Sequence, residues 1–190
     1  MNLYNAKKEP HFIEAYQKHF AGLNPKRVLE IGVQNGGSLK IWRDMFPRAE
    51  IVGIDIDEEC TRQRDTNIEV RIGDQTDEKF LESLGEFDII IDDGGHKMSQ
   101  QQISFNLLMP KLREGGIYII EDTHTSYWEG FLDLRITTVE MIKGLIDDIH
   151  EYADVYKDGV PTRSIVKKGL SNKYQVKSIA VYPGITFIFK

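Results

Sequence analysis

Short apolar runs rich in β-branched residues recur along the first 122 residues, and segments with a helical pattern separate most of them. The runs occupy residues 27–33, 50–57, 67–74, 87–93 and 116–122. After the fourth run, SQQQISFNLLMPKLREGG carries apolar residues at helical spacing. This alternation predicts βαβ units, which build a parallel sheet covered by helices on both faces through right-handed crossovers. Such sheets bind ligands beyond the carboxyl ends of their strands.

The last residues of the sequence depart from this alternation. Residues 176–190, VKSIAVYPGITFIFK, form two apolar runs divided by Tyr-Pro-Gly, which predicts an antiparallel hairpin. We expect a helix at 10–21, before the first strand, and another at 137–152. The lysine-rich segment 156–174 is expected to be the longest loop and to form a solvated surface.

Length and composition indicate one ordinary globular domain. The chain has 190 residues, of which 41% are hydrophobic and 28% charged, so we expect a single domain over 1–190 with an N-terminal helical segment at about 1–24. No apolar run is long enough for a membrane span and the first residues have no signal core, which predicts a cytoplasmic protein. The net charge of −6 argues against nucleic acid as a partner. The single cysteine, Cys60, is expected to be an inert thiol.

A glycine-rich turn follows the first predicted strand in VLEIGVQNGGSLKIW, residues 28–42. A strand that turns in this way into a helix presents backbone N–H groups and a helix N-terminus to a nucleotide-like cofactor. The second run ends near Asp55, about 20 residues later, where an adenosine ribose needs a hydroxyl acceptor. The third run ends in Gly73-Asp74-Gln75, which places a carboxylate and an amide where they meet an adenine edge.

Two cofactors fit this outline, NAD and S-adenosylmethionine. The dinucleotide fingerprint G-x-G-x-x-G lacks its second glycine here, because three other residues separate Gly32 from Gly36. Acidic strand ends also repel a pyrophosphate, whereas S-adenosylmethionine carries an ammonium and a sulfonium and no phosphate. The sequence therefore favours S-adenosylmethionine over an NAD-dependent oxidoreductase. The acidic strand ends are Glu30, Asp55, Asp74 and Asp92.

Two acidic pairs close the fourth and fifth runs, which the predicted fold makes neighbouring strands. The pairs are Asp92-Asp93 and Glu121-Asp122. Neighbouring strands lie about 4.8 Å apart, so the four carboxylates are expected to crowd into one volume. Either some of them are protonated or a cation lies among them, and hard oxygen ligands suit Mg²⁺ or Ca²⁺ better than zinc. We favour a metal. Successive strand residues face opposite ways, so Asp92 and Asp93 should differ in role.

Candidate catalytic and acceptor-binding residues lie beside these pairs. His96 follows three residues after Asp93, and a neutral imidazole beside a metal-bound hydroxyl accepts its proton. Tyr127 and Trp128 are candidates for the wall of an acceptor pocket because aromatic faces stack on sugar rings, and packing in the core is their alternative. His124 is the third candidate for acceptor binding.

Five motifs together carry a family resemblance. They are EIGVxxGGSL at 30–39, IVGIDID at 51–57, IDDGGH at 91–96, GGIYIIEDTHTSYW at 115–128 and SIAVYPGITFIFK at 178–190. This combination resembles the Mg²⁺-dependent S-adenosylmethionine O-methyltransferases of natural-product sugars, a family that includes macrolide sugar methyltransferases and cephalosporin hydroxylase-like proteins. The resemblance covers most of the chain from about residue 27. Gly95 stands where members of that family usually have serine.

The resemblance implies an α/β fold with the seven-stranded, Rossmann-like sheet of class I methyltransferases, mostly parallel with a C-terminal antiparallel hairpin strand. It implies S-adenosylmethionine and Mg²⁺ as cofactors, Asp93, Glu121 and Asp122 as metal ligands, and His96 with Asp93 in catalysis. Asp92 would lie near the amino-acid end of the cofactor. The other residues expected to bind the cofactor are Glu30, Gly32, Gly36, Ser38, Asp55, Asp74 and Gln75.

These observations predict an S-adenosylmethionine- and Mg²⁺-dependent enzyme that methylates a hydroxyl of a sugar or of a glycosylated natural product. Its expected partner is a small-molecule acceptor, without nucleic acid or membrane, and the open hairpin edge permits a homo-oligomer. One alternative is a catechol-type O-methyltransferase, and another is a catalytically silent protein that binds S-adenosylmethionine. The silent alternative is disfavoured because packing does not require the metal-ligand set and His96 together.

Overall fold

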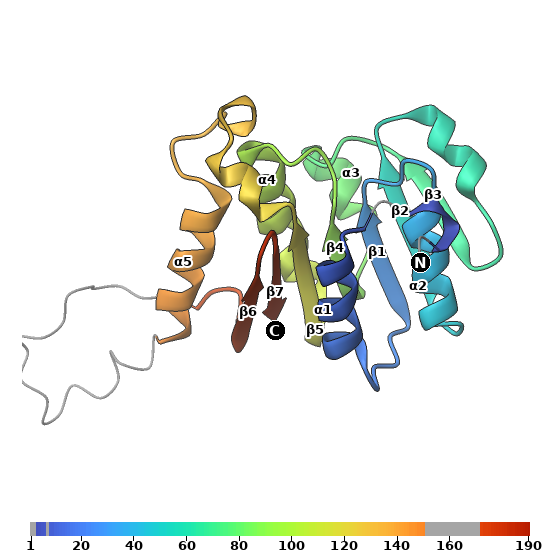
Figure 1. The fold of residues 1–190 in the computed structure, drawn as a ribbon, viewed down its shortest axis with the longest axis horizontal. Coiled ribbons are helices and arrows are strands. Elements are labelled where there is room, and N and C mark those ends of the chain that lie inside the picture. The colour runs from blue at the N-terminus through green and yellow to red at the C-terminus, as the bar shows by residue number, and fades with distance from the viewer. Residues whose placement is uncertain (1–2, 7, 151–171) are drawn as a thin grey trace, which may run out of the picture.

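The described residues of the computed structural model, 3–6, 8–150 and 172–190, are organised around one seven-stranded sheet with helices on both faces (Figure 1). The strand order is β3-β2-β1-β4-β5-β7-β6. The strands are β1 (Arg27–Ile31), β2 (Glu50–Asp55), β3 (Ile68–Ile72), β4 (Phe87–Asp92), β5 (Leu112–Glu121), β6 (Ser178–Tyr182) and β7 (Ile185–Phe189).

The pairing of the strands confirms the expected fold class. β1 to β5 pair in parallel, whereas β7 runs antiparallel to both β5 and β6. The strand order reverses direction between β1 and β4, which is the topological switch point where open α/β sheets bind ligands. The register pairs Glu121 at the end of β5 with Ile185 at the start of β7, so the C-terminal hairpin supports that end of β5.

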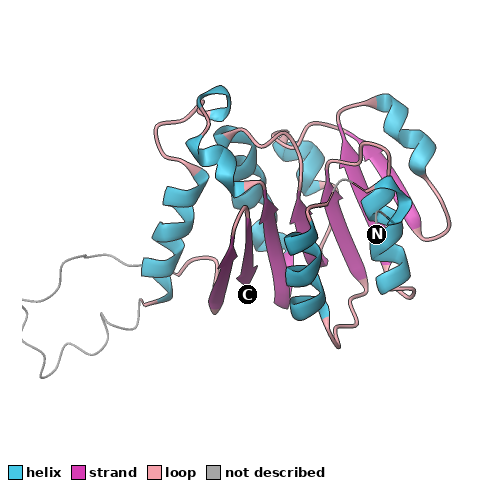
Figure 2. Ribbon diagram, viewed as in Figure 1, coloured by secondary structure: helices cyan, strands magenta, loops and turns pink. Residues whose placement is uncertain are grey.

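Helices connect the parallel strands, and local sequence signals mark where several of them begin (Figure 2). Pro10 occupies the first turn of α1, where its missing N–H costs nothing. The side chains of Asp77 and Thr137 cap the first turns of α3 and α5. The helices are α1 (Pro10–Phe20), α2 (Gly37–Met45), α3 (Glu78–Glu82), α4 (Met98–Leu108) and α5 (Thr138–Ile149). Shorter 3₁₀ turns are Leu3–Asn5, Glu58–Gln63, Met109–Lys111, Thr123–Tyr127 and Glu129–Phe131.

The sheet separates two hydrophobic cores, as its apolar strands require. On the face covered by α1 and α2, the rings of Tyr16 and Trp42 lie 4.8 Å apart, and Phe187 of β7 packs against Tyr16. On the other face α3, α4 and α5 cover the sheet, with Phe105 against Tyr118. Alternate residues of one strand therefore face different helices, and this alternation sets the direction of each acidic side chain at a strand end.

Several details of the sequence-based prediction need adjustment. β5 begins at Leu112, earlier than expected, because Leu112 pairs with Phe87 across an irregular register before regular pairing resumes at Ile117. The predicted helix at 137–152 ends at Ile149 in the described part, and residues 151–171, with most of the predicted long loop, lie outside the described residues. Burial raises the pKa of the Cys60 thiol to about 12, so this cysteine is inert at neutral pH.

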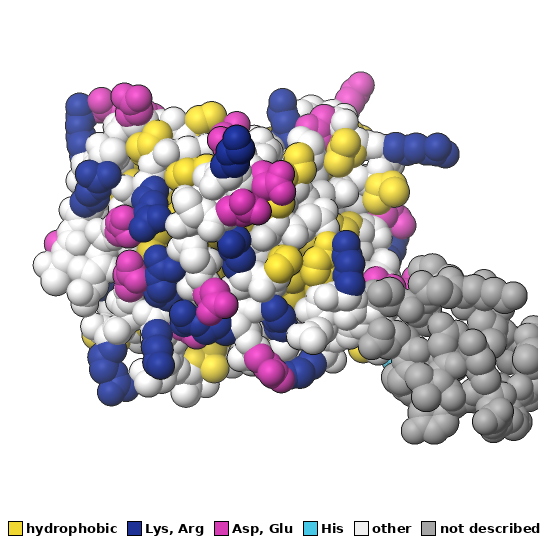
Figure 3. Space-filling model, turned by 180° about the vertical axis from the view of Figure 1, so that it is seen from behind, with side chains coloured by type: hydrophobic (Ala, Val, Ile, Leu, Met, Phe, Trp, Pro, Cys, Tyr) yellow, Lys and Arg dark blue, Asp and Glu magenta, His cyan; other side chains and the backbone are white. Residues whose placement is uncertain are grey.

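The surface is mixed in charge. On the face turned away from the viewer of Figure 1, the described Lys and Arg side chains are interspersed with Asp and Glu (Figure 3). None of the described helices combines the length and the apolar composition that a bilayer crossing requires.

Candidate functional site

A cavity of about 240 Å³ lies beyond the carboxyl ends of β1, β2, β3 and β4, at the switch point of the sheet. Four residues predicted to bind the cofactor line it: Gly32, Asp55, Asp74 and Gln75. Gln34, Gly94, Gly95 and Gln100 also line it, although the sequence did not predict a role in cofactor binding for them. Their only sequence signal is their position directly after a strand or at the start of the following helix.

Gly32 allows the ends of β1 and β4 to meet at this cavity. Its φ is +91°, and a Cβ at this position would lie 2.1 Å from the carbonyl oxygen of Asp93. Gly95 relates to Gln100 in a similar way, since a Cβ on Gly95 would lie 2.2 Å from Gln100 Oε1. The amide of Gln100 thus fills the space beside Gly95.

Asp55 ties β2 to the glycine-rich turn. Its carboxylate accepts hydrogen bonds from the backbone N–H groups of Val33, Gln34 and Asp57. Burial acts to raise the pKa of Asp55, but these backbone donors outweigh burial and lower it. Asp55 is therefore a fixed anion on the wall of the cavity, as an acceptor for ribose hydroxyls would be.

Four other residues predicted to bind the cofactor are absent from the cavity lining: Glu30, Gly36, Ser38 and Asp92. Glu30 is fully buried and accepts a hydrogen bond from Ser38 Oγ at 2.7 Å. Asp92 is fully buried on the opposite face, where Ser104 Oγ donates to it at 2.5 Å, and burial raises its pKa to about 6. Their roles toward a cofactor stay predictions.

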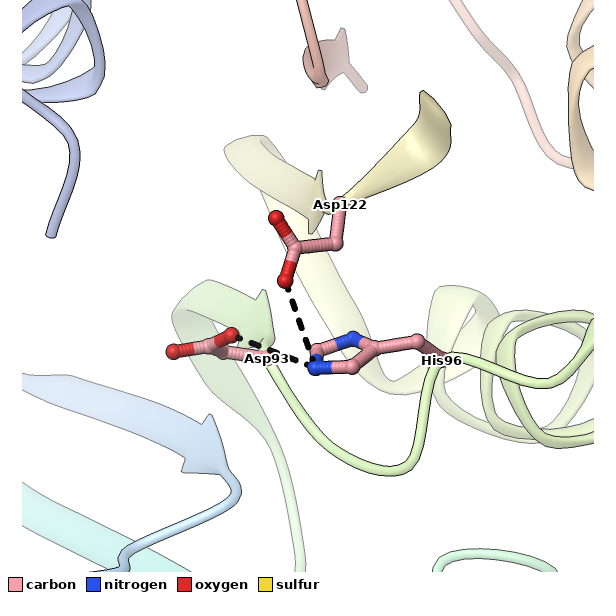
Figure 4. A group of neighbouring side chains, drawn as sticks. All are labelled: Asp93, His96 and Asp122. Atoms are coloured by element: carbon pink, nitrogen blue, oxygen red, sulfur yellow. Dashed lines mark ion pairs between the residues drawn. The ribbon is translucent and has the colours of Figure 1, made fainter. Parts of the chain in front are cut away.

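A second group of side chains lies next to the cavity, and Asp93 belongs to both. Asp93, His96 and Asp122 each point one oxygen or nitrogen atom into a common space, and these atoms lie within 4.8 Å of one another (Figure 4). We call these three residues the ligand group. His96 Nε2 lies 3.3 Å from Asp122 Oδ2 and 3.9 Å from Asp93 Oδ1. Each side chain is 20–30% exposed, so a ligand can reach them.

The backbone of the ligand group is strained in two places. His96 has a φ of 59° and Asp122 a φ of 53°, both in the left-handed region that residues other than glycine seldom adopt. Such conformations persist where the surrounding structure enforces them, and they cluster at functional sites. Here the N–H of Thr123 donates to the carbonyl of Gly184 in the hairpin turn, which holds the loop that follows Asp122.

The ligand group fits a divalent cation. Two carboxylates supply hard oxygen donors, and His96 Nε2 faces the same space, where a hydroxyl bound to the cation would lie within its reach. His96 Nδ1 is buried and has no hydrogen-bond partner among the described residues, so no second group fixes the tautomer of this imidazole.

Glu121 is not a member of the ligand group. Its buried carboxylate accepts hydrogen bonds from Tyr16 OH at 2.5 Å and from Lys8 Nζ at 2.6 Å. Lys8 Nζ also lies 2.7 Å from Asp93 Oδ2 and 3.3 Å from Glu30 Oε1. We call Lys8, Tyr16, Glu30, Glu121 and the shared Asp93 the lysine cluster.

Asp92 lies apart from the other three carboxylates at the ends of β4 and β5, so the expectation that all four share one volume is wrong. Asp93 adjoins Glu121 through Lys8 and Asp122 through His96. The cause is strand geometry, because Glu121 is still part of β5 and faces α1, whereas Asp122 lies beyond the strand and turns toward His96. Asp92 faces α4 through Ser104. The role of Glu121 as a metal ligand stays a prediction.

The lysine cluster places one ammonium among three carboxylates, counting that of Asp93. Burial raises the pKa of Glu121 to about 8 against the opposing effect of Lys8, and it also raises the pKa of Glu30. Burial alone would lower the pKa of Lys8, but the surrounding carboxylates outweigh it and raise that pKa. Lys8 is therefore a cation at neutral pH, and burial makes Glu121 easier to protonate than an ordinary glutamate.

An exposed apolar segment follows Asp122. Tyr127 and Trp128 are 72% and 52% exposed, so the alternative that they pack in the core is wrong. The Trp128 ring lies 4.6 Å from that of His124. Exposed Leu132, Leu134 and Ile136 continue this apolar surface. Two side-chain contacts tether the segment to α4, Ser99 to Asp133 and Gln102 to the carbonyl of Ile136. Binding of an acceptor by His124, Tyr127 and Trp128 stays a prediction.

Comparisons with known proteins agree with this geometry. Residues 29–123 match a family model described as a methyltransferase domain. L-olivosyl-oleandolide 3-O-methyltransferase from Streptomyces antibioticus is 36% identical over 180 residues, which cover 84% of this chain and 46% of that protein. Mycinamicin VI 2''-O-methyltransferase from Micromonospora griseorubida is 35% identical, over 94% of this chain and 48% of that protein. The chain thus spans about half the length of the curated relatives it matches.

A solved structure extends the similarity to the whole described fold. MycE methyltransferase from the mycinamycin biosynthetic pathway, in complex with Mg, SAH and mycinamycin VI, superposes with a TM-score of 0.82 at 32% identity. The superposition covers 98% of this chain and 51% of that one. This structure has the same fold as the present chain and holds a metal and a cofactor product together.

Proposed function

This chain belongs to the methyltransferase-domain family, and on that premise we propose that it transfers a methyl group from S-adenosylmethionine to a hydroxyl of a small sugar-bearing molecule, with a divalent cation required. One observation carries the proposal: Asp93 lies both on the wall of the cavity at the switch point and in the ligand group with His96 and Asp122. A methyl donor and a cation-bound acceptor would therefore meet at this residue.

The cavity residues suit the adenosine half of the cofactor. Asp55 is a fixed anion that offers oxygen acceptors, and Asp74 and Gln75 lie on the same wall. Acidic walls suit a ligand that carries a sulfonium and an ammonium. When bound, S-adenosylmethionine supplies an activated methyl group on a positively charged sulfur.

The ligand group suits a cation that also touches the acceptor. Asp93 and Asp122 would hold it, with Glu121 as the third ligand that the family resemblance implies. When bound, a divalent cation lowers the pKa of a coordinated hydroxyl and fixes its orientation. These three carboxylates come from the ends of β4 and β5, which are rigid elements of the sheet.

His96 is the proton acceptor of the proposal. Its Nε2 lies in the ligand group, 3.3 Å from Asp122, where an acceptor hydroxyl would be held. As the oxygen–methyl bond forms and the sulfur–methyl bond breaks, the hydroxyl proton moves to His96 Nε2 and S-adenosylhomocysteine leaves neutral at sulfur. General-base catalysis of this kind contributes roughly 10²–10⁴ in rate.

An acceptor panel tests the proposed function. The purified chain is incubated with methyl-labelled S-adenosylmethionine, Mg²⁺ and three acceptor classes: deoxysugar glycosides of polyketides, free sugars and catechols. We expect label in the glycosides, loss of labelling in chelator and recovery with Mg²⁺. Labelling of catechols alone would replace the sugar acceptor by the catechol alternative. Undiminished labelling in chelator would contradict the cation requirement.

The Asp122→Asn variant separates the two binding sites. It removes one anionic ligand without changing shape, so we expect Mg²⁺ affinity to fall by about tenfold or more while S-adenosylmethionine affinity stays close to that of the wild type. Calorimetric titration measures both affinities. Asp65→Asn, which removes an exposed carboxylate paired with Arg43, is the matched control and should change neither. Wild-type Mg²⁺ affinity in Asp122→Asn would remove Asp122 from the metal site.

A further inference from the structure

We infer that Lys8 is a positioning residue that competes with the divalent cation of the proposed site, so that a cation held by Asp93 and Glu121 must displace its ammonium. This inference rests on the proposed function, because it concerns the same metal site. It adds a residue from outside the matched family region, since the family model begins at residue 29.

The ammonium of Lys8 lies between two carboxylates. Lys8 Nζ donates to Asp93 Oδ2 at 2.7 Å and to Glu121 Oε1 at 2.6 Å, so one ammonium bridges two of the three carboxylates assigned to the metal. Both distances are typical of charge-assisted hydrogen bonds. The side chain of Lys8 is only 3% exposed, so it is an interior cation and not a surface lysine beside the site.

Asp93 is shared between Lys8 and the ligand group. One of its oxygens faces Lys8, and the other points toward His96 in the ligand group, 3.9 Å from Nε2. A divalent cation that uses Asp93 and Glu121 together must enter the space between them, where the ammonium now lies. Two like charges a few Å apart in a partly buried site repel strongly, so both cannot occupy this space.

The segment that precedes Lys8 in the sequence packs closely against the rest of the fold. The residues before Lys8 lie against the glycine-rich turn and α2: Asn35 Nδ2 donates to the carbonyl of Asn5 at 3.1 Å, and Tyr4 OH donates to Asp44 of α2. A Cβ on Gly37 would lie 2.6 Å from the carbonyl oxygen of Tyr4, which shows how closely this segment packs. Displacing the ammonium would therefore loosen contacts on the turn that leads to the cofactor cavity.

The buried carboxylates around Lys8 explain why the chain supplies a cation here. Glu30 and Glu121 are buried beside the partly exposed Asp93, and isolated buried carboxylates are costly. Lys8 compensates them while no metal is bound. The groups facing Lys8 are these three carboxylates, the hydroxyl of Tyr16 on the shared Glu121 oxygen, and the Trp42 ring, whose centroid lies 5.8 Å from Nζ.

Metal titration of Lys8 variants tests the inference. In Lys8→Met the competing charge is gone, so Mg²⁺ and Mn²⁺ should bind about tenfold tighter or more by calorimetry, the lower end of what removing a like charge a few Å away gives at an effective dielectric of about 20. Lys8→Arg keeps the charge and should return the affinity toward the wild-type value. Lys18→Met, an exposed lysine of α1 near the Tyr182 ring, is the matched control and should bind as the wild type does.

Unchanged or weaker metal binding in Lys8→Met overturns the inference, and so does the absence of Mg²⁺ binding in every variant. The wild-type chain provides a second test that needs no substitution. Hydrogen exchange of backbone amides in residues 3–6 and 8–9 should accelerate when Mg²⁺ is added, because the ammonium leaves its carboxylates. Unchanged or slower exchange contradicts displacement.

These outcomes are separable from those of the proposed function. A chain that binds Mg²⁺ tighter as Lys8→Met but labels no acceptor supports the inference and contradicts the proposed function. A chain that labels sugar acceptors with Mg²⁺ while Lys8→Met keeps wild-type affinity supports the proposed function and overturns the inference.

Discussion

The ligand group and the lysine cluster lie at the same edge of the sheet, share Asp93, and differ in what balances their charge. In the lysine cluster the side chains of Lys8, Glu30 and Glu121 are 3%, 0% and 2% exposed, and the chain supplies its own cation. In the ligand group the two carboxylates are 25–30% exposed and share His96, while Asp93 also pairs with Lys8 and Asp122 Oδ1 lies 3.8 Å from His124 Nδ1. Burial thus decides whether charge compensation is built into the chain or left to solvent and ligands.

Burial and internal donors therefore distinguish the acidic residues at a strand end that are available for chemistry from those that are not. A buried carboxylate with two internal donors, such as Glu121, is already satisfied and changes partner only when a stronger cation arrives. A half-exposed carboxylate such as Asp122 keeps free lone pairs toward an incoming ligand. The same sequence signal, an acidic residue at the end of a strand, therefore covers both a structural ion pair and a reactive site.

The largest expected effect separates the two regions by function. His96→Ala removes the proton acceptor of the ligand group, so turnover should fall by roughly 10²–10⁴ while the melting temperature changes little. Steady-state methyl transfer and thermal unfolding measure the two quantities. His11→Ala, an exposed histidine on α1 that contacts the carbonyl of Pro183, is the control and should keep its turnover. Turnover unchanged in His96→Ala would leave the ligand group without a base.

The next prediction compares a buried and an exposed ion pair of equal length by their contribution to the free energy of unfolding. Lys8 lies 2.6 Å from Glu121 and Lys143 lies 2.6 Å from Glu140, but only the first pair is buried. Lys8→Met leaves buried carboxylates without a cation, so the free energy of unfolding should fall by about 3–5 kcal/mol in metal-free buffer. Mg²⁺ should restore part of this loss, because binding to the folded state stabilises it. Urea unfolding with and without Mg²⁺ measures both.

Lys143→Met is the matched control of that comparison. Exposed ion pairs gain little because water screens them, so we expect no measurable change in its unfolding midpoint. Equal losses in the two variants would mean that burial does not distinguish the two ion pairs.

The smallest expected effect concerns a single hydroxyl. Tyr16→Phe removes the donor to Glu121 in the lysine cluster, which should lower the free energy of unfolding by about 1–3 kcal/mol. Tyr182→Phe removes a half-buried hydroxyl that bonds His19, and its cost should be smaller. A larger loss in Tyr182→Phe than in Tyr16→Phe would contradict the importance of burial in the lysine cluster.

Local patterns in the sequence suffice to predict most of the fold. The apolar runs that became β1, β2 and β4 lie where hydrophobic periodicity placed them, and the Tyr-Pro-Gly turn correctly predicted the hairpin of β6 and β7. The carboxyl ends of parallel strands meet at one edge, so motifs at those ends were also placed together correctly. Gly32, Asp55, Asp74 and Gln75 around one cavity follow from this rule.

The lysine cluster could not be predicted in this way. Lys8 is 85 residues from Asp93 and 113 from Glu121 in the sequence, and no spacing rule connects them. Glu121 was grouped with Asp122 because they are adjacent in sequence. Where β5 ends decides which way each side chain points, and strand ends are the least certain feature of a sequence-based assignment.

The contact between Thr123 and Gly184 also has a consequence for the order in which the protein is made. Glu121 pairs with Ile185 and Thr123 with Gly184, so the loop that carries Asp122 gains its support only after residues 178–189 have left the ribosome. Until then the edge of β5 lacks its neighbour and presents unpaired backbone groups to other chains. The ligand group is therefore completed only after the hairpin has been made, and a nascent chain that stops before the hairpin would carry every residue of that group without the strand that holds Asp122 in place.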